Sequence, residues 1–135
     1  MDKIVFDDSL KVNIPTIDGQ HARLIDMLNQ LIDYKAGQVD VPLAEVLSEL
    51  AAYVDYHFAT EEDLFEEYQY PQSEAHKAEH QSYTQKLADF NAEYEKDQTI
   101  GLPDEIITFL FDWIKHHIQV VDRQYAPFLL EKGVQ

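Results

Sequence analysis

Four long stretches of this 135-residue chain carry apolar side chains at the three- and four-residue spacing of an α-helix. We predict helices over residues 18–36, 42–68, 72–96 and 103–125. Gly37, Pro71 and Pro103 lie where these helices should end or begin. Long helices joined by short loops become antiparallel neighbours, so the fold class should be all-α, an up-down-up-down antiparallel four-helix bundle.

The two ends of the chain should behave differently from the bundle. Residues 1–17 show no helical repeat, and we expect an extended N-terminal arm lying across the helices. Pro127 should bend or end the fourth helix, and a short last helix should close at Gly133. This length suits one hydrophobic core, so residues 1–135 are expected to form a single domain with the bundle over residues 18–132.

The apolar stripes of the predicted helices also contain polar residues. On the fourth helix the inner stripe should comprise Ile106, Leu110, Trp113, His117 and Val121. Across the chain we select as candidate metal ligands His21, His57, Glu61, His76, His80, His117 and Asp122. Burying imidazoles and carboxylates among apolar residues is costly unless something pairs with them. A metal is such a partner, and these ligand types suit iron, manganese or zinc.

Helix geometry supports most of these candidates. His57 and Glu61 are four residues apart, as are His76 and His80, so each pair shares one face of its helix. His117 and Asp122 are five residues apart, which is about 500° of rotation and leaves them roughly 140° apart. Asp122 could therefore join a common site only through a tilted side chain or a local distortion of the helix.

The positions along the helices agree as well. In an antiparallel bundle the start of the first and third helices and the end of the second and fourth lie together. All seven candidates fall at that end. A lone histidine in an apolar stripe is more often a hydrogen-bonded core residue than a metal ligand. A metal site is indicated because all four apolar stripes carry candidate ligands. Seven ligands exceed the need of one ion, and two ions bridged by the two carboxylates would leave one position open.

Composition restricts the function further. The chain has 26 acidic and 10 basic residues and a net charge of −16, which repels nucleic acid and anionic membranes. It has no cysteine, which excludes disulfides and thiolate metal sites. The N-terminus lacks the features of a signal peptide, and no apolar run is long enough to span a membrane. We expect a cytoplasmic protein, monomeric, without nucleic-acid or membrane partners.

Four motifs then resemble the hemerythrin family, in particular its single-domain bacterial members, over nearly the whole chain. They are Ile14-Pro15-x-Ile17-Asp18-x-Gln20-His21, His57-Phe58-x-x-Glu61-Glu62, Tyr70-Pro71 leading to His76-x-x-x-His80, and Trp113-Ile114-x-x-His117-Ile118-x-x-x-Asp122-x-x-Tyr125. The sequence departs from the family at Phe6, Ile114 and Phe65, where Trp, Leu and Met are common. These changes keep the ligand pocket apolar but alter its shape.

The resemblance implies two iron ions in a non-haem di-iron centre with a bridging oxo or hydroxo group. It assigns His76, His80 and His117 to the fully coordinated iron and His21 and His57 to the iron with the open position. Glu61 and Asp122 would bridge the two ions. It also implies reversible O2 binding at the open iron, for oxygen storage, delivery or buffering, with O2 as the partner.

Other interpretations remain open from the sequence. The chain could be a di-iron enzyme, such as an oxidase, peroxidase or nitric oxide reductase, although histidine-rich ligation favours binding over catalysis. It could also be a sensor acting through a partner, and zinc could replace iron in an isolated sample. His116 should be a surface histidine, whereas Phe58, Trp113 and Tyr125 should serve mainly in packing. Asp18, Gln20 and Glu62 are near enough in sequence to support the ligating imidazoles.

Overall fold

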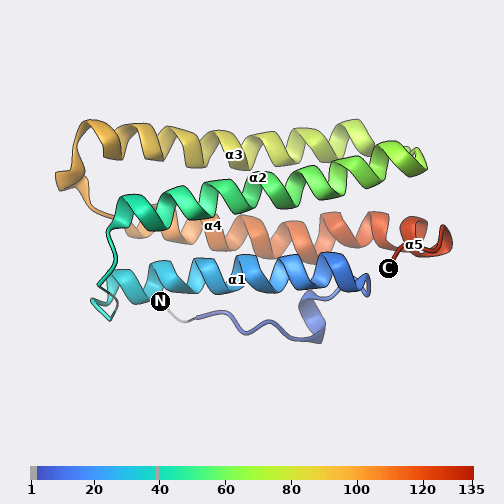
Figure 1. Cartoon of the computed structure of the whole chain (residues 1–135), viewed down its shortest axis with the longest axis horizontal. Helices are drawn as coiled ribbons and strands as arrows, with labels where there is room; N and C mark the ends of the chain where they lie inside the picture. The colour runs from blue at the N-terminus through green and yellow to red at the C-terminus, as the bar shows by residue number, and fades with distance from the viewer. Residues whose placement is uncertain (1–2, 39) are drawn as a thin grey trace.

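Four long helices lie side by side in the computed structural model, which describes residues 3–38 and 40–135 (Figure 1). They are α1 (Pro15–Lys35), α2 (Leu43–Tyr68), α3 (Ser73–Lys96) and α4 (Asp104–His116). α1 contacts α2 and α4, and α3 contacts the same two helices. Successive helices run in opposite directions (Figure 1), which confirms the predicted antiparallel bundle.

Proline and residues with positive φ set most helix boundaries. α1 begins three residues before the predicted start because Pro15 fits the first helical turn. It ends before Gly37, whose φ is 74°. α2 ends at Tyr68, and the next residue, Gln69, adopts the left-handed conformation with φ 57° just before Tyr70 and Pro71. The prediction of helices two and three was therefore correct to within one residue at each end.

The end of the fourth helix differs from the prediction. α-Helical geometry stops at His116, a π-helical segment runs over His117–Asp122, and α5 (Arg123–Glu131) follows. Pro127 neither ends nor separates these helices but lies inside α5. Proline has no backbone N–H, so the helical hydrogen bond from residue 127 to the carbonyl of Arg123 is missing. Arg123 directly follows the π-helical segment, where the regular α-helical hydrogen bonds are already interrupted. The predicted closure at Gly133 is confirmed by its φ of 86°.

The bundle core also corrects the predicted stripe of the fourth helix. The buried residues of α4 and the π segment lie mainly on a neighbouring row, namely Ile107, Leu110, Phe111, Ile114, His117 and Ile118. Ile106 and Trp113 are only partly buried against this core. α4 contacts both α1 and α3, so a broad arc of its surface is apolar and a single stripe does not describe it.

Two apolar clusters fill the interior. The larger one runs through the bundle and includes Leu28, Leu50 and Phe58. The smaller one lies at the end of the bundle where α1 begins and α2 ends. It is formed by Val12, Ile14, Ile17, Phe65, Tyr70, Tyr125, Ala126 and Leu129. On α2, Glu61 lies in sequence between Phe58 of the larger cluster and Phe65 of the smaller one. A buried polar layer therefore separates two apolar ones.

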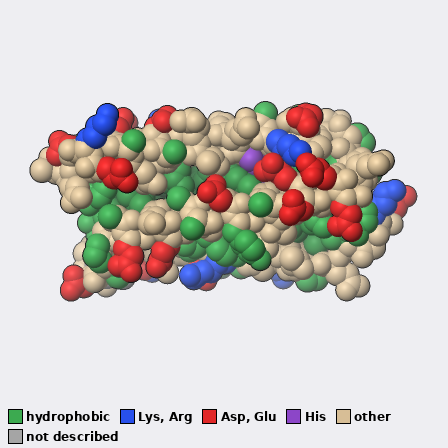
Figure 2. Space-filling view, turned by 45° about the horizontal axis from the view of Figure 1, so that its top comes forward, with side chains coloured by type: hydrophobic (Ala, Val, Ile, Leu, Met, Phe, Trp, Pro, Cys, Tyr) green, Lys and Arg blue, Asp and Glu red, His purple; other side chains and the backbone are tan. Residues whose placement is uncertain are grey.

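The surface is polar and acidic. Figure 2 shows acidic side chains spread over one face, with apolar side chains visible between them. Within the described ranges, no helix combines the length and the hydropathy that crossing a bilayer requires.

The N-terminal arm is extended, as predicted, but it lies along α1 rather than across the helices (Figure 1), and it contains one short 3-10 turn, η1 (Asp8–Leu10). Asp18 anchors it at one end: its two carboxylate oxygens accept hydrogen bonds from the backbone N–H groups of Val12, at 2.8 Å, and Asn13, at 3.1 Å. At the other end Asn29 exchanges two hydrogen bonds with the backbone of Ile4. These bonds hold Val12 and Ile14 over the smaller cluster.

Replacing Asp18 with Ala should therefore release the arm and expose that cluster. Hydrogen bonds to a charged acceptor are stronger than neutral ones, so we expect a loss of about 1–3 kcal/mol in the free energy of unfolding. Urea denaturation measures it. Asp26→Ala, an exposed carboxylate on the same helix, is the control, and equal effects of the two substitutions would contradict the anchoring role.

Candidate metal centre

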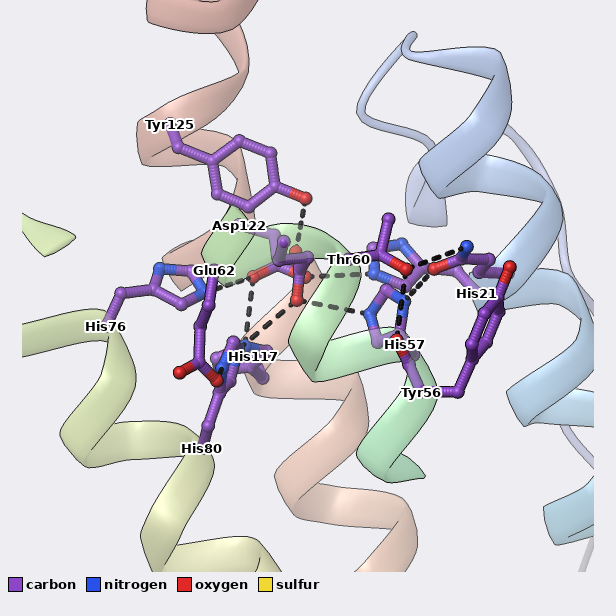
Figure 3. A network of polar contacts seen from close by, with 12 residues as sticks. His21, Tyr56, His57, Thr60, Glu62, His76, His80, His117, Asp122 and Tyr125 are labelled. Carbon is purple, nitrogen blue, oxygen red and sulfur yellow. Dashed lines mark hydrogen bonds and ion pairs between the residues drawn. The ribbon is translucent and has the colours of Figure 1, made fainter. Parts of the chain in front are cut away.

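The seven predicted ligands meet at one end of the bundle (Figure 3). α1 supplies His21, α2 supplies His57 and Glu61, α3 supplies His76 and His80, and the π segment supplies His117 and Asp122. None of these side chains is more than 3% exposed. The antiparallel order of the helices predicted that all seven candidates lie at the same end of the bundle, and this is confirmed. His116, as predicted, is exposed.

The ligand atoms form two groups that share both carboxylates. One group consists of Glu61, His76, His80, His117 and Asp122, and the other of His21, His57, Glu61 and Asp122. Within each group the candidate ligand atoms lie within 4.8 Å of one another. One group therefore offers three imidazoles and the other two.

Asp122 faces both groups with different oxygens. Its Oδ2 lies 3.0 Å from Nε2 of His21. Its Oδ1 lies 3.0 Å from Nε2 of His76 and 2.9 Å from Nε2 of His117. The carboxylate thus spans the space between the two groups.

The π segment brings Asp122 into this position. π-Helical hydrogen bonds join residues five apart, so that positions i and i+5 follow one another on nearly the same face. His117 and Asp122 are the first and last residues of the segment. The local distortion that ideal helix geometry required is present at the place where the ligands need it.

Glu61 is arranged differently from Asp122. Its Oε1 lies 3.2 Å from Nε2 of His57 and 3.2 Å from Nε2 of His80, which belong to different groups. Its Oε2 accepts a hydrogen bond from the hydroxyl of Tyr125. Only one oxygen of Glu61 is therefore directed at the imidazoles.

Several of these atoms are buried without a hydrogen bond among the described residues. They are both ring nitrogens of His21 and His117, Nε2 of His76 and His80, Oε1 of Glu61 and both oxygens of Asp122. Nitrogen and oxygen approach to about 3 Å, but their directions do not suit hydrogen bonds. Converging lone pairs of this kind fit a bound cation, and a purely structural network would instead satisfy its members.

The carboxylates carry negative charge in this setting. Burial and the charge of Asp122 both raise the pKa of Glu61, but His57 and His80 outweigh them and lower it. Burial likewise opposes ionisation of Asp122, whose pKa His117, His21 and His76 hold well below its ordinary value. Burial, followed by the charges of Glu61 and Asp122, raises the pKa of Tyr125 well above 10, so its hydroxyl remains a donor.

Two imidazoles are oriented by side chains behind them. Nδ1 of His57 donates to Oε1 of Gln20 at 2.7 Å. The amide of Gln20 is itself fixed because its Nε2 donates to Thr60 at 3.3 Å, and Thr60 donates to the carbonyl of Tyr56 at 3.0 Å. A proton on Nδ1 leaves the Nε2 lone pair of His57 free for a metal.

His80 is supported by a charged partner. Its Nδ1 lies 3.0 Å from Oε2 of Glu62, which lines a surface groove of about 760 Å³ together with Phe58. Gln20 and Glu62 were thus rightly named as candidates, whereas Asp18 anchors the arm. Sequence reasoning missed Thr60 because its role passes through Gln20, and it expected Tyr125 to serve mainly in packing rather than as a donor to Glu61.

Aromatic rings limit how far the imidazoles can rotate. Phe58 stacks on His80 with ring centroids 3.8 Å apart and an interplanar angle of 5°. Trp113 stacks on His117 at 4.4 Å and 15°. Phe65 contacts His76 edge-on at 4.7 Å. The predicted packing role of Phe58 and Trp113 therefore includes direct contact with candidate ligands.

Comparison with known proteins agrees with this geometry. The family profile described as Hemerythrin HHE cation binding domain matches residues 12–129. The chain is 36% identical to a bacteriohemerythrin of Stenotrophomonas maltophilia, covering 91% of this chain and 79% of that protein. It is 30% identical to a bacteriohemerythrin of Clostridium acetobutylicum, covering 90% and 97%.

Solved structures show the same fold. A wild-type hemerythrin crystal structure aligns with a TM-score of 0.78 and 31% identity, covering 86% of this chain and 88% of that one. The structure of a leucine-to-phenylalanine mutant aligns with a TM-score of 0.83 and 28% identity, covering 94% and 97%. The chain belongs to the hemerythrin family.

Proposed function

We propose that this chain binds O2 reversibly at a non-haem di-iron centre, for storage, delivery or buffering of oxygen. The observation that carries the proposal is the inequality of the two ligand groups, with three imidazoles in one and two in the other. If each group holds one iron and Glu61 and Asp122 serve both, the ion beside His21 and His57 has fewer protein ligands. That ion is the one with room for a small ligand.

Iron in its ferrous state supplies the electrons that O2 requires in order to bind. The protein supplies the geometry and the surroundings. Asp122 holds its two oxygens toward different groups, and Gln20 keeps Nε2 of His57 directed at the site. The seven ligands are almost completely buried between two apolar clusters, which excludes water and favours release of unchanged O2 over irreversible oxidation.

Oxygen cycling tests the function directly. Protein reconstituted with ferrous iron under anaerobic conditions should develop a visible absorption band on exposure to O2 and lose it on purging with inert gas. The band should return on a second exposure, with little loss of amplitude. Irreversible oxidation in the first cycle, accompanied by turnover of an added reductant, would instead support a di-iron enzyme.

Removal of one imidazole tests the assignment of the ligand groups. His57→Ala should lower the iron content from about two to about one per chain, because the smaller group loses one of its two imidazoles. Elemental analysis of the purified protein measures this. His116→Ala removes an exposed histidine and should retain both ions; full iron content in the His57 variant would refute this assignment.

The hydrogen bond between His57 and Gln20 can be tested separately. Gln20→Leu preserves the approximate volume but removes the acceptor of the Nδ1 proton, so metal binding should weaken about 10–100-fold. Competition with a chelator of known affinity measures the change. Gln30→Leu, on the same helix and only partly buried, is the matched control, and an equal loss in both variants would argue against a specific role for Gln20.

A further inference from the structure

The π segment that carries His117 and Asp122 is supported from outside its own helix by the N-terminal arm. The segment lies between α4 and α5 in one continuous helical stretch, and outside that stretch its main contact is with η1 of the arm. The arm passes this end of the bundle beside the start of α1 (Figure 1). π-Helical turns are rare in proteins, so a segment of this kind is expected to need such support.

Arg123, the residue directly after Asp122, ties the arm to the end of the π segment. Its Nη2 donates to the carbonyl of Ser9 at 2.6 Å, and the carbonyls of Asp8 and Lys11 lie 3.5 and 3.4 Å away. Hydrogen bonds from a charged donor are stronger than neutral ones. The guanidinium group therefore holds η1 and its flanking residues against the segment that contains Asp122.

The same stretch of the arm is tied to α1 on its other side. Asp18 accepts hydrogen bonds from two adjacent backbone N–H groups of the arm. It lies three residues before His21, so the two share one side of α1. Residues 8–13, which we call the strap, thus connect the turn of α1 that carries His21 to the residue that follows Asp122.

His21 and Asp122 are the ligands that the strap holds together. Nε2 of His21 lies 3.0 Å from Oδ2 of Asp122, and both side chains are fully buried (Figure 3). Of the seven candidate ligands α1 contributes His21 alone, and His21 belongs only to the group with two imidazoles. The other group is built from α2, α3 and the π segment. Separation of α1 from the π segment would therefore affect mainly the two-imidazole group.

We propose that the strap, held by Arg123, clamps His21 against Asp122 and so sets the affinity of the two-imidazole group for its metal ion. Arg123 is a positioning residue, because it acts on the ligands through the strap and through the backbone next to Asp122. The inference rests on the metal site of the proposed function and not on O2 binding.

The charge of Arg123 and its contact with the strap predict effects of opposite sign. By Coulomb's law alone, removal of a positive charge near the site should favour binding of a cation. Release of the strap should instead let α1 move away from the π segment and weaken binding of the ion beside His21. Arg123→Met keeps a long side chain but has neither the charge nor an N–H donor, so it distinguishes the two effects.

Asn29 offers a matched control on the same arm. It exchanges two hydrogen bonds with the backbone of Ile4. It lies eight residues beyond His21 on α1, which is about 12 Å along the helix. Asn29→Ala thus releases the arm at a point remote from the strap, and it should leave the binding of both ions unchanged.

The experiment titrates metal-free wild-type protein, Arg123→Met and Asn29→Ala with Co²⁺ in the absence of O2 and follows the visible bands of bound Co²⁺. The wild type should bind two ions per chain, and the group with three imidazoles should fill first. Arg123→Met should bind the first ion with wild-type affinity and the second about tenfold more weakly. Metal-free Arg123→Met should also melt about 3–6 °C below the wild type.

A double-mutant cycle identifies the ion that is affected. His21→Ala removes a ligand of the two-imidazole group and leaves the three-imidazole group complete. If Arg123 acts through His21, adding Arg123→Met to His21→Ala should change the affinity of the remaining ion by less than about twofold. A tenfold loss in that background would show that Arg123 supports the site in general, which contradicts the inference.

Three further results would overturn the role of the strap. They are equal weakening of both ions by Arg123→Met, unchanged or tighter binding of the second ion, and the same selective loss in Asn29→Ala. Failure of oxygen cycling together with the expected Co²⁺ pattern would count against the proposed function alone. Normal cycling together with unchanged Co²⁺ binding by Arg123→Met would count against the strap alone.

Discussion

The burial of two carboxylates among five imidazoles is the constraint on which the rest of this structure depends. Glu61 and Asp122 are fully buried, and the charge of Asp122 raises the cost of ionising Glu61. The surrounding histidines outweigh these costs and lower the pKa of both carboxylates, yet many of their nitrogens have no hydrogen bond within the described ranges. A cation held between the groups would satisfy these atoms, and its binding would then add to the free energy of folding.

Much of the fold follows from residue spacing. The helical repeat and the breakers at Pro71 and Pro103 gave four helices and their antiparallel order, and the order placed the ligands at one end. The i,i+4 pairs on α2 and α3 could be assigned because their geometry is that of a regular helix. The ligand roles of individual residues came from resemblance and remain proposals.

The parts that sequence did not predict share a physical cause: they depend on departures from regular helix geometry or on contacts between distant residues. Nothing local marks His117–Asp122 as π-helical, so the fourth helix was expected to continue. Because the apolar face of α4 is broad, the sequence did not show which of its apolar residues are the most buried. Tyr125 and Glu61 are 64 residues apart in sequence, and only the fold shows that a packing residue also donates to a ligand.

The π segment has a further consequence for the architecture of the fourth helix. Upstream of it, side chains are in register with the bundle core, through Leu110 and Ile114. Downstream, Tyr125 and Leu129 are in register with the cluster under the arm. The π-helical segment shifts the helical register between α4 and α5, which would otherwise form one continuous helix. Packing in the bundle and the geometry of the site can therefore vary independently on either side of this segment.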